Sequence, residues 1–177
     1  MNLINTTKQS STLPLLLSFV TVTFFALFMS PIKAKEANNV TYKSAKDELA
    51  LLLTQHNGKV IYLDFWASWC GPCRKSFPWM NKIQSTYSSE KFTVISINVD
   101  NDEALAKEFL HTLPASFPVV YDPKGELAKK YNVKGMPSSY LINSSGELVQ
   151  QHTGFFSKKI KQYEHEITQL IDDINHF

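Results

Sequence analysis

Apolar and polar residues follow one another in blocks that predict alternating helices and strands. Two short continuous apolar runs, Lys59–Phe65 and Phe92–Val99, are typical of strands buried on both faces of a sheet. Apolar residues at helical spacing predict helices over Ser44–Gln55, Cys73–Tyr87, Glu103–Leu113, Glu126–Tyr131 and the stretch after Ser157. We expect Leu105, Phe109 and Leu113 to form the buried stripe of the third helix, and Ser157 to cap the last one.

The second half of the chain adds strand signals of another kind. Pro118–Tyr121 is a short apolar run, and Asn143–Gly146 is a turn sequence between two strand-like runs, Ser139–Ile142 and Glu147–His152, which predicts a hairpin. Alternating strands and helices followed by a hairpin favour an α/β fold, with a mixed β-sheet and helices on both faces.

The first 34 residues form a separate segment. Leu13–Met29 is almost wholly apolar, and a plausible cleavage site follows at Ala34. Residues 1–34 are therefore predicted to be a secretory signal peptide, or an uncleaved N-terminal membrane anchor, because the apolar run approaches the about 17 to 20 residues that a span needs. Residues 35–43 are interpreted as a linker and residues 44–177 as one domain outside the cytoplasm, in a bacterial periplasm.

Composition narrows the functional class. The formal net charge is +2 and the basic residues are scattered, which argues against a nucleic-acid surface. The chain has two cysteines, Cys70 and Cys73. A bridge between them closes a very short loop and would stabilise the fold little, so a pair at a strand-to-helix junction is interpreted as redox-active. A zinc site would need two further ligands, and no metal is predicted.

The residues around this pair resemble a known family. Asp64–Cys73 closely resembles the active-site segment of thioredoxin, and Gly135-Met136-Pro137 resembles the cis-proline loop of that fold. The secretory N-terminus and the inserted segment Asp100–Tyr131 are similar to the TlpA/ResA-like branch of the thioredoxin superfamily. The resemblance implies a three-layer thioredoxin-like fold and a thiol:disulfide oxidoreductase that needs no cofactor beyond the redox-active Cys70–Cys73 disulfide.

The resemblance also implies catalytic roles. Cys70 is the expected nucleophile, since a helix N-terminus lowers the pKa of a thiol, and Cys73 is expected to be more buried and to resolve the mixed disulfide. Asp64 is the expected acceptor of the Cys73 proton. The alternative for Asp64 is a structural carboxylate bonded to the backbone or to Lys59. Relatives often carry Glu at the position of Ser76.

A second set of residues is expected to bind the substrate. Trp69, Gly71 and Pro72 belong to the active-site segment. The bond before Pro137 is predicted to be cis, which would place the backbone of Met136 and Pro137 beside the cysteines, where it can pair with an extended substrate chain. An ordinary trans turn proline is the alternative.

The dipeptide between the cysteines suggests a direction. Gly71-Pro72 is the dipeptide of reducing thioredoxins, whose potentials lie near about −270 mV, so we expect a reductant of protein disulfides. The resemblance implies cysteine-containing secreted proteins such as apocytochrome c as clients, a membrane electron donor of the DsbD/CcdA type, and a monomer that binds no nucleic acid. The alternatives are a peroxiredoxin-like peroxidase and a non-catalytic peptide-binding or holdase module.

Overall fold

The computed structural model describes residues 44–87 and 89–175. The predicted leader and linker, residues 1–34 and 35–43, lie outside these residues. None of the helices in these two ranges combines the length and the hydropathy that a membrane span requires.

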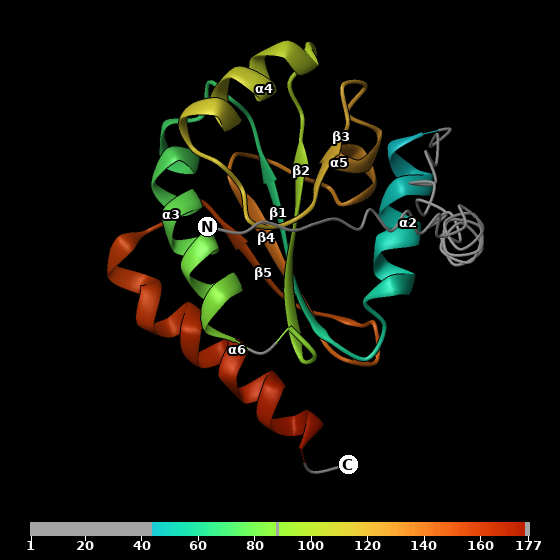
Figure 1. The fold of residues 1–177 in the computed structure, drawn as a ribbon, viewed down its shortest axis with the longest axis vertical. Helices are drawn as coiled ribbons and strands as arrows, with labels where there is room; N and C mark the ends of the chain where they lie inside the picture. Colours follow the sequence, from blue (N-terminus) through green and yellow to red (C-terminus); the bar gives the residue numbers. More distant parts are fainter. Residues whose placement is uncertain (1–43, 88, 176–177) are drawn as a thin grey trace, which may run out of the picture. The chain divides into compact units, whose positions relative to one another are not determined.

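Five strands form one mixed sheet in the order β3-β2-β1-β4-β5 (Figure 1). They are β1 (Val60–Trp66), β2 (Phe92–Asn98), β3 (Val119–Tyr121), β4 (Ser138–Ile142) and β5 (Leu148–Thr153). The first three run parallel, whereas β4 is antiparallel to both β1 and β5. β1 is therefore the central strand. Every residue of β1 and β2 is buried, as the continuous apolar runs predicted.

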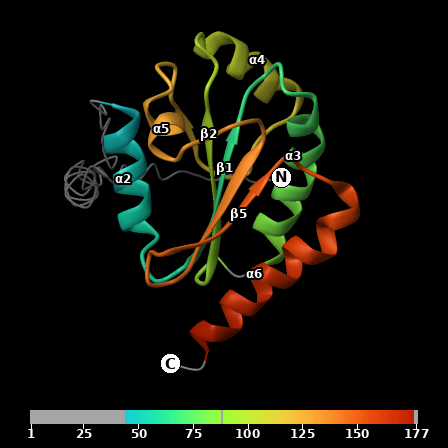
Figure 2. The same cartoon turned by 180° about the vertical axis from the view of Figure 1, so that it is seen from behind.

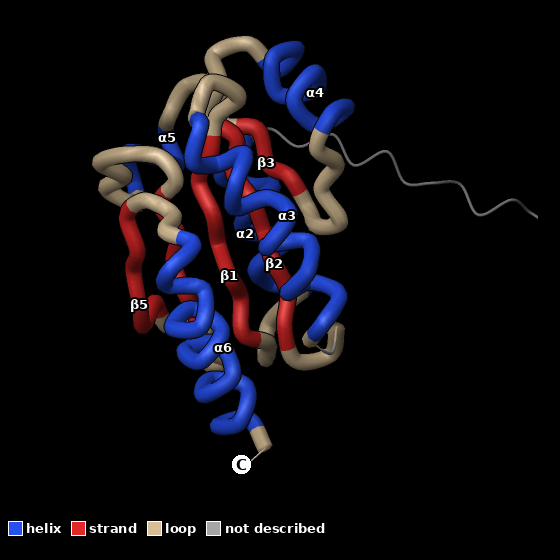
Figure 3. Tube along the Cα trace, turned by 90° about the vertical axis from the view of Figure 1, so that its left-hand side faces the viewer, coloured by secondary structure: helices blue, strands red, loops and turns tan. Residues whose placement is uncertain are grey.

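Helices cover both faces of the sheet, as predicted (Figure 3). They are α2 (Ala45–Gln55), α3 (Gly71–Thr86), α4 (Glu103–Thr112), α5 (Glu126–Lys130) and α6 (Ile160–Ile174), which follows the 3₁₀ helix η1 (Ser157–Lys159). Figures 1 and 2 show α3 and α6 on one side of the sheet and α2 and α5 on the other.

Successive side chains of β1 point to opposite faces of the sheet. Tyr62 and Trp66 belong to the apolar cluster beneath α3 and α6, whereas Leu63 and Phe65 belong to the cluster beneath α2 and α5. Asp64 lies between Tyr62 and Trp66 in this alternation. Its carboxyl therefore projects toward the face that α3 and α6 cover.

Two local expectations are wrong. Leu105 is 46% exposed, and the buried residues of α4 are Ala106 and Phe109. The orientation of α4 is set by Phe109, whose ring lies 4.7 Å from that of Trp66, because an aromatic ring in the core buries more apolar surface than one leucine. Ser157 does not cap the last helix: it begins η1, and the N-cap residue of α6 is Lys159, without a side-chain cap.

Candidate active site

Cys70 and Cys73 are joined in a disulfide where β1 leads into α3, with their Cα atoms 5.3 Å apart. Cys70 is the N-cap residue of α3, and its Sγ accepts a hydrogen bond from the Cys73 backbone N–H at 3.2 Å. Cys70 is 3% exposed and Cys73 is 0% exposed. Once the disulfide opens, the helix N-terminus favours a negative charge on the Cys70 sulfur.

The rim of the disulfide is formed by exposed residues of the same segment. Trp69 is 69% exposed, the largest exposed fraction among the exposed large hydrophobic residues of the described chain, and Gly71 and Pro72 form the exposed first turn of α3. Arg74 donates from Nη2 to the Ser68 carbonyl at 3.3 Å, and its guanidinium lies 4.7 Å from the centre of the Phe109 ring. This side chain therefore links the active-site loop to α4.

Asp100 braces the loop before Cys70, a role that the sequence did not suggest. Its buried carboxylate accepts hydrogen bonds from the Ser68 backbone N–H at 2.9 Å and from the Ser68 hydroxyl at 3.0 Å. The Asn98 side-chain amide donates to it at 2.8 Å. The sequence did contain a signal for this role, because Asn98 and Asp100 are polar residues at the end of a buried strand. Parallel strands end at the same edge of a sheet, so these two residues lie near the end of β1, where the active-site loop begins.

The bond between Met136 and Pro137 is cis, as predicted. Its place beside the disulfide segment follows from strand register. Phe65 pairs with Ser138 in antiparallel strands, so the residues just before Ser138 lie beside those just after Phe65. Pro137 is thus brought next to the segment that runs from Trp66 toward Cys70.

Asp64 is the unusual group of the site. It is 1% exposed, and its Oδ2 is one of two buried side-chain atoms in the described residues that have no hydrogen-bond partner. Burial raises the pKa of this carboxyl well above its usual range. The structural alternative for Asp64 finds no support in Lys59, whose Nζ donates to the Ser89 carbonyl at 2.8 Å.

Ser76 lies on α3, three residues after Cys73. It is buried, and its hydroxyl donates to the Cys73 carbonyl at 3.0 Å. This position therefore supplies no carboxylate, whereas Asp64 on β1 supplies a buried one. The described residues contain no group of three or more His, Cys, Asp or Glu side chains that could hold a metal ion.

Comparisons with known proteins identify the family to which the chain belongs. The Redoxin family model matches residues 32–167. The thiol-disulfide oxidoreductase ResA of Bacillus thuringiensis subsp. konkukian is 32% identical over 135 residues, which cover 76% of this chain and 78% of the relative.

Solved structures give the same result. A protein described as the thiol:disulfide interchange protein DsbE of Chlorobium tepidum matches with a TM-score of 0.66 and 46% identity, covering 67% of this chain and 84% of the other. The exposed lipoprotein thioredoxin Etrx1 of Streptococcus pneumoniae matches with a TM-score of 0.56 and 31% identity, covering 64% and 88%. The chain, with its cysteine pair at the start of α3, therefore belongs to the Redoxin family and is a TlpA/ResA-like thiol:disulfide oxidoreductase of the thioredoxin superfamily.

Proposed function

We propose that this protein reduces disulfide bonds of client proteins outside the cytoplasm, with Cys70 as the attacking thiolate, Cys73 as the resolving thiol and Asp64 as the proton acceptor. The observation that carries the proposal is the buried Asp64 carboxyl, whose Oδ2 has no partner among the described residues. A carboxyl in such a place destabilises the fold. Its use as a base for the Cys73 proton gives a reason for its presence.

The reaction starts from the reduced protein. The Cys70 thiolate attacks one sulfur of the client disulfide, the client S–S bond breaks, and the released client thiolate takes a proton from solvent. A mixed disulfide then joins Cys70 to the client. The exposed Trp69, Gly71 and Pro72, together with Met136 and Pro137, form the surface on which the client chain docks.

The second step releases the client. Cys73 Sγ gives its proton to the Asp64 carboxylate and attacks Cys70 Sγ. The bond between Cys70 and the client breaks, and the second client sulfur leaves as a thiolate. Two electrons have passed to the client, and the protein holds the Cys70–Cys73 disulfide that the structure contains.

The direction, compartment and partners are part of the proposal. The Gly71-Pro72 dipeptide supports a reducing potential, and the apolar run Leu13–Met29 supports export to the periplasm, with the run either cleaved as a signal or retained as an anchor. An exported reductant needs electrons across the membrane, and a donor of the DsbD/CcdA type would supply them. Secreted proteins with cysteines, apocytochrome c among them, are the proposed clients.

Reduction of insulin by dithiothreitol tests the proposal. The purified protein should accelerate precipitation of the insulin B chain, and Cys70→Ser should remove the acceleration. Cys73→Ala should instead accumulate a mixed disulfide with the client. An unchanged rate in Cys70→Ser would overturn the mechanism, and a measured potential above about −150 mV would overturn the reducing direction.

A further inference from the structure

A row of polar side chains crosses the sheet, starting from Asp64. Strand register pairs Asp64 on β1 with Ser139 on β4, and Ser139 with His152 on β5. Side chains at directly paired positions project from the same face, with Cβ atoms about 4.5 to 5.5 Å apart. Beyond His152, the ring Nε2 lies 2.7 Å from Oε2 of Glu166 on α6. Four polar residues therefore follow one another across three strands and one helix.

On the β2 side of Asp64, the row of polar side chains ends after one residue. The partner of Asp64 on β2 is Ser96. The Ser96 hydroxyl accepts a hydrogen bond from Trp66 Nε1 at 3.2 Å, and the next residue across the sheet is Val119 on β3. An apolar side chain cannot pass a proton. Any route along the sheet from Asp64 to solvent therefore leads through Ser139.

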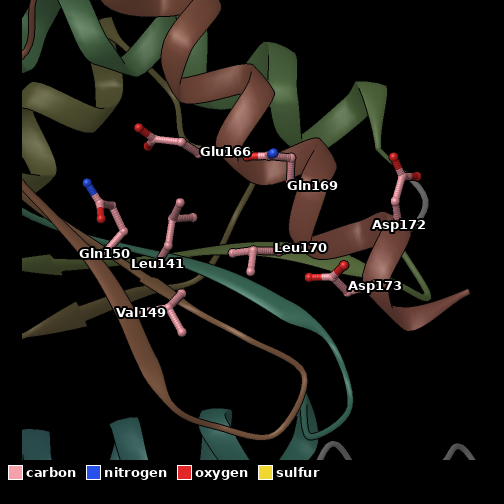
Figure 4. Close-up of a pocket in the computed structure, with 8 residues that line it drawn as sticks. All are labelled: Leu141, Val149, Gln150, Glu166, Gln169, Leu170, Asp172 and Asp173. Atoms are coloured by element: carbon pink, nitrogen blue, oxygen red, sulfur yellow. The ribbon is translucent and has the colours of Figure 1, made fainter. Parts of the chain in front are cut away.

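The far end of the row reaches a cleft between β5 and α6. Glu166 lines this cleft with Gln150 and Gln169, and its volume is about 500 Å³. Figure 4 shows Glu166 and Gln169 on the helix, and Gln150 opposite them on the strand. The side chains of His152 and Glu166 are 11% and 20% exposed, whereas Ser139 is 4% exposed. Exposure thus increases from the buried end of the row toward the cleft.

Few other titratable groups face this row. Tyr62, on the same face of β1, interacts with the Ser139 side chain, and burial raises the pKa of its hydroxyl well above the usual value. The Tyr163 ring of α6 lies 4.8 Å from the His152 ring, and burial raises the pKa of its hydroxyl too. Both phenols therefore stay neutral at physiological pH, and the remaining acidic and basic side chains of the row are those of Asp64, His152 and Glu166.

We propose that Ser139, His152 and Glu166 form a proton relay between Asp64 and the solvent of the β5–α6 cleft. The inference rests on the proposed role of Asp64 as the base for Cys73. Since burial favours the protonated carboxyl at rest, that proton must leave before Asp64 can accept another one. The three relay residues act through Asp64 and are positioning residues for the reaction.

The transfer changes no bond between heavy atoms and moves no electrons. The Asp64 proton passes to Ser139 Oγ while the Ser139 hydroxyl proton passes to Nδ1 of His152, the ring nitrogen that is not bonded to Glu166. The proton on His152 Nε2 passes to the Glu166 carboxylate and then to water in the cleft. When the disulfide is reduced again, Asp64 returns its proton to the Cys73 thiolate. Asp64 then takes up a proton from the cleft through the same atoms in reverse, which restores the starting tautomer of His152.

Stopped-flow measurement of the resolving step tests the relay in the full-length reduced protein mixed with a disulfide-bonded client. His152→Gln and Glu166→Gln should each slow client release about 10-fold at neutral pH, less than the about 10²-fold expected for loss of the base itself in Asp64→Asn. Formation of the mixed disulfide by Cys70 should keep its rate. Imidazole buffer should restore client release in His152→Gln, because a small base can enter the cleft. The matched control is His165→Gln, an exposed histidine of the same helix.

The outcomes separate the relay from the proposed function. If Asp64→Asn slows client release while both His152→Gln and Glu166→Gln match the wild-type rate at every pH, the relay is wrong and the role of Asp64 as the base stands. If Asp64→Asn releases the client at the wild-type rate, the role of Asp64 fails and the relay fails with it. A slow His152→Gln variant that imidazole does not rescue indicates a structural role and also overturns the relay.

Discussion

Replacing Asp64 with leucine should stabilise the protein once the pH exceeds the raised pKa of the Asp64 carboxyl, and it should slow the reaction. The leucine side chain is close to aspartate in shape but has no polar atom. Asp64 is 1% exposed in the wild type, and its Oδ2 has no hydrogen-bond partner among the described residues. A buried polar group without a partner costs about 1 to 3 kcal/mol. The free energy of unfolding of Asp64→Leu should therefore exceed that of the wild type by about 1 to 3 kcal/mol at pH values where Asp64 is ionised.

The pH dependence gives this prediction its sign. Burial raises the pKa of Asp64 in the folded protein, whereas an unfolded aspartate titrates near about 3.9. Between these two values the folded protein binds more protons than the unfolded chain, so the contribution of Asp64 to stability falls as the pH rises. The advantage of the leucine variant should be smallest near about pH 4 and grow until Asp64 ionises in the folded protein.

Urea unfolding at a series of pH values measures the difference, and a thermal midpoint should rise by about 2 to 4 °C per kcal/mol. The matched control is Asp173→Leu, which removes a carboxylate from an exposed position on α6. Its difference from the wild type should show no comparable dependence on pH, because the Asp173 side chain stays in contact with water in the folded protein. A flat difference for Asp64→Leu, or a wild type that is more stable at high pH, would refute the reasoning.

Three further substitutions test other parts of the site. Trp69→Ala should lower kcat/KM for insulin reduction about 10-fold and change stability by less than about 0.5 kcal/mol in urea, because Trp69 is 69% exposed. Asp100→Asn should lower the free energy of unfolding in urea by about 1 to 3 kcal/mol, since an amide nitrogen would replace an oxygen that accepts from Ser68 or Asn98. Leu105→Ser should leave the free energy of unfolding in urea within about 0.5 kcal/mol of the wild type, because Leu105 is 46% exposed, and a larger loss would place it in the core.

Features set by local sequence were predictable. The continuous apolar runs identified β1 and β2, because a strand covered by helices on both faces needs no polar side. The turn at Asn143–Gly146 identified the hairpin of β4 and β5. The spacing of Cys70 and Cys73, together with the strand-to-helix change between Trp66 and α3, located the disulfide. Each of these signals lies within a few residues of the feature that it predicts.

Features that depend on packing between distant segments were missed. The orientation of α4 is set by contacts of Phe109 with Trp66 and Phe77, which periodicity within α4 cannot rank against Leu105. No local pattern marks His152 as one member of a pair, yet its ring lies against Glu166 because β5 lies beneath α6. Strand register places Ser139 between Asp64 and His152. Because this register is known only once the strands have paired, the row of polar side chains could not be predicted from the sequence.

Three buried aspartates of this chain show how unusual Asp64 is. Asp100 accepts hydrogen bonds from the backbone and side chain of Ser68 and from Asn98. Asp122 accepts three from backbone N–H groups at the start of α5, between 2.9 and 3.0 Å. At both residues, hydrogen bonds replace the water that the carboxylate oxygens lose on burial. The fold thus satisfies the carboxylates of Asp100 and Asp122 where they hold loops in place, and it leaves Oδ2 of Asp64 without a partner on the face that α3 and α6 cover, where we propose that it accepts the Cys73 proton.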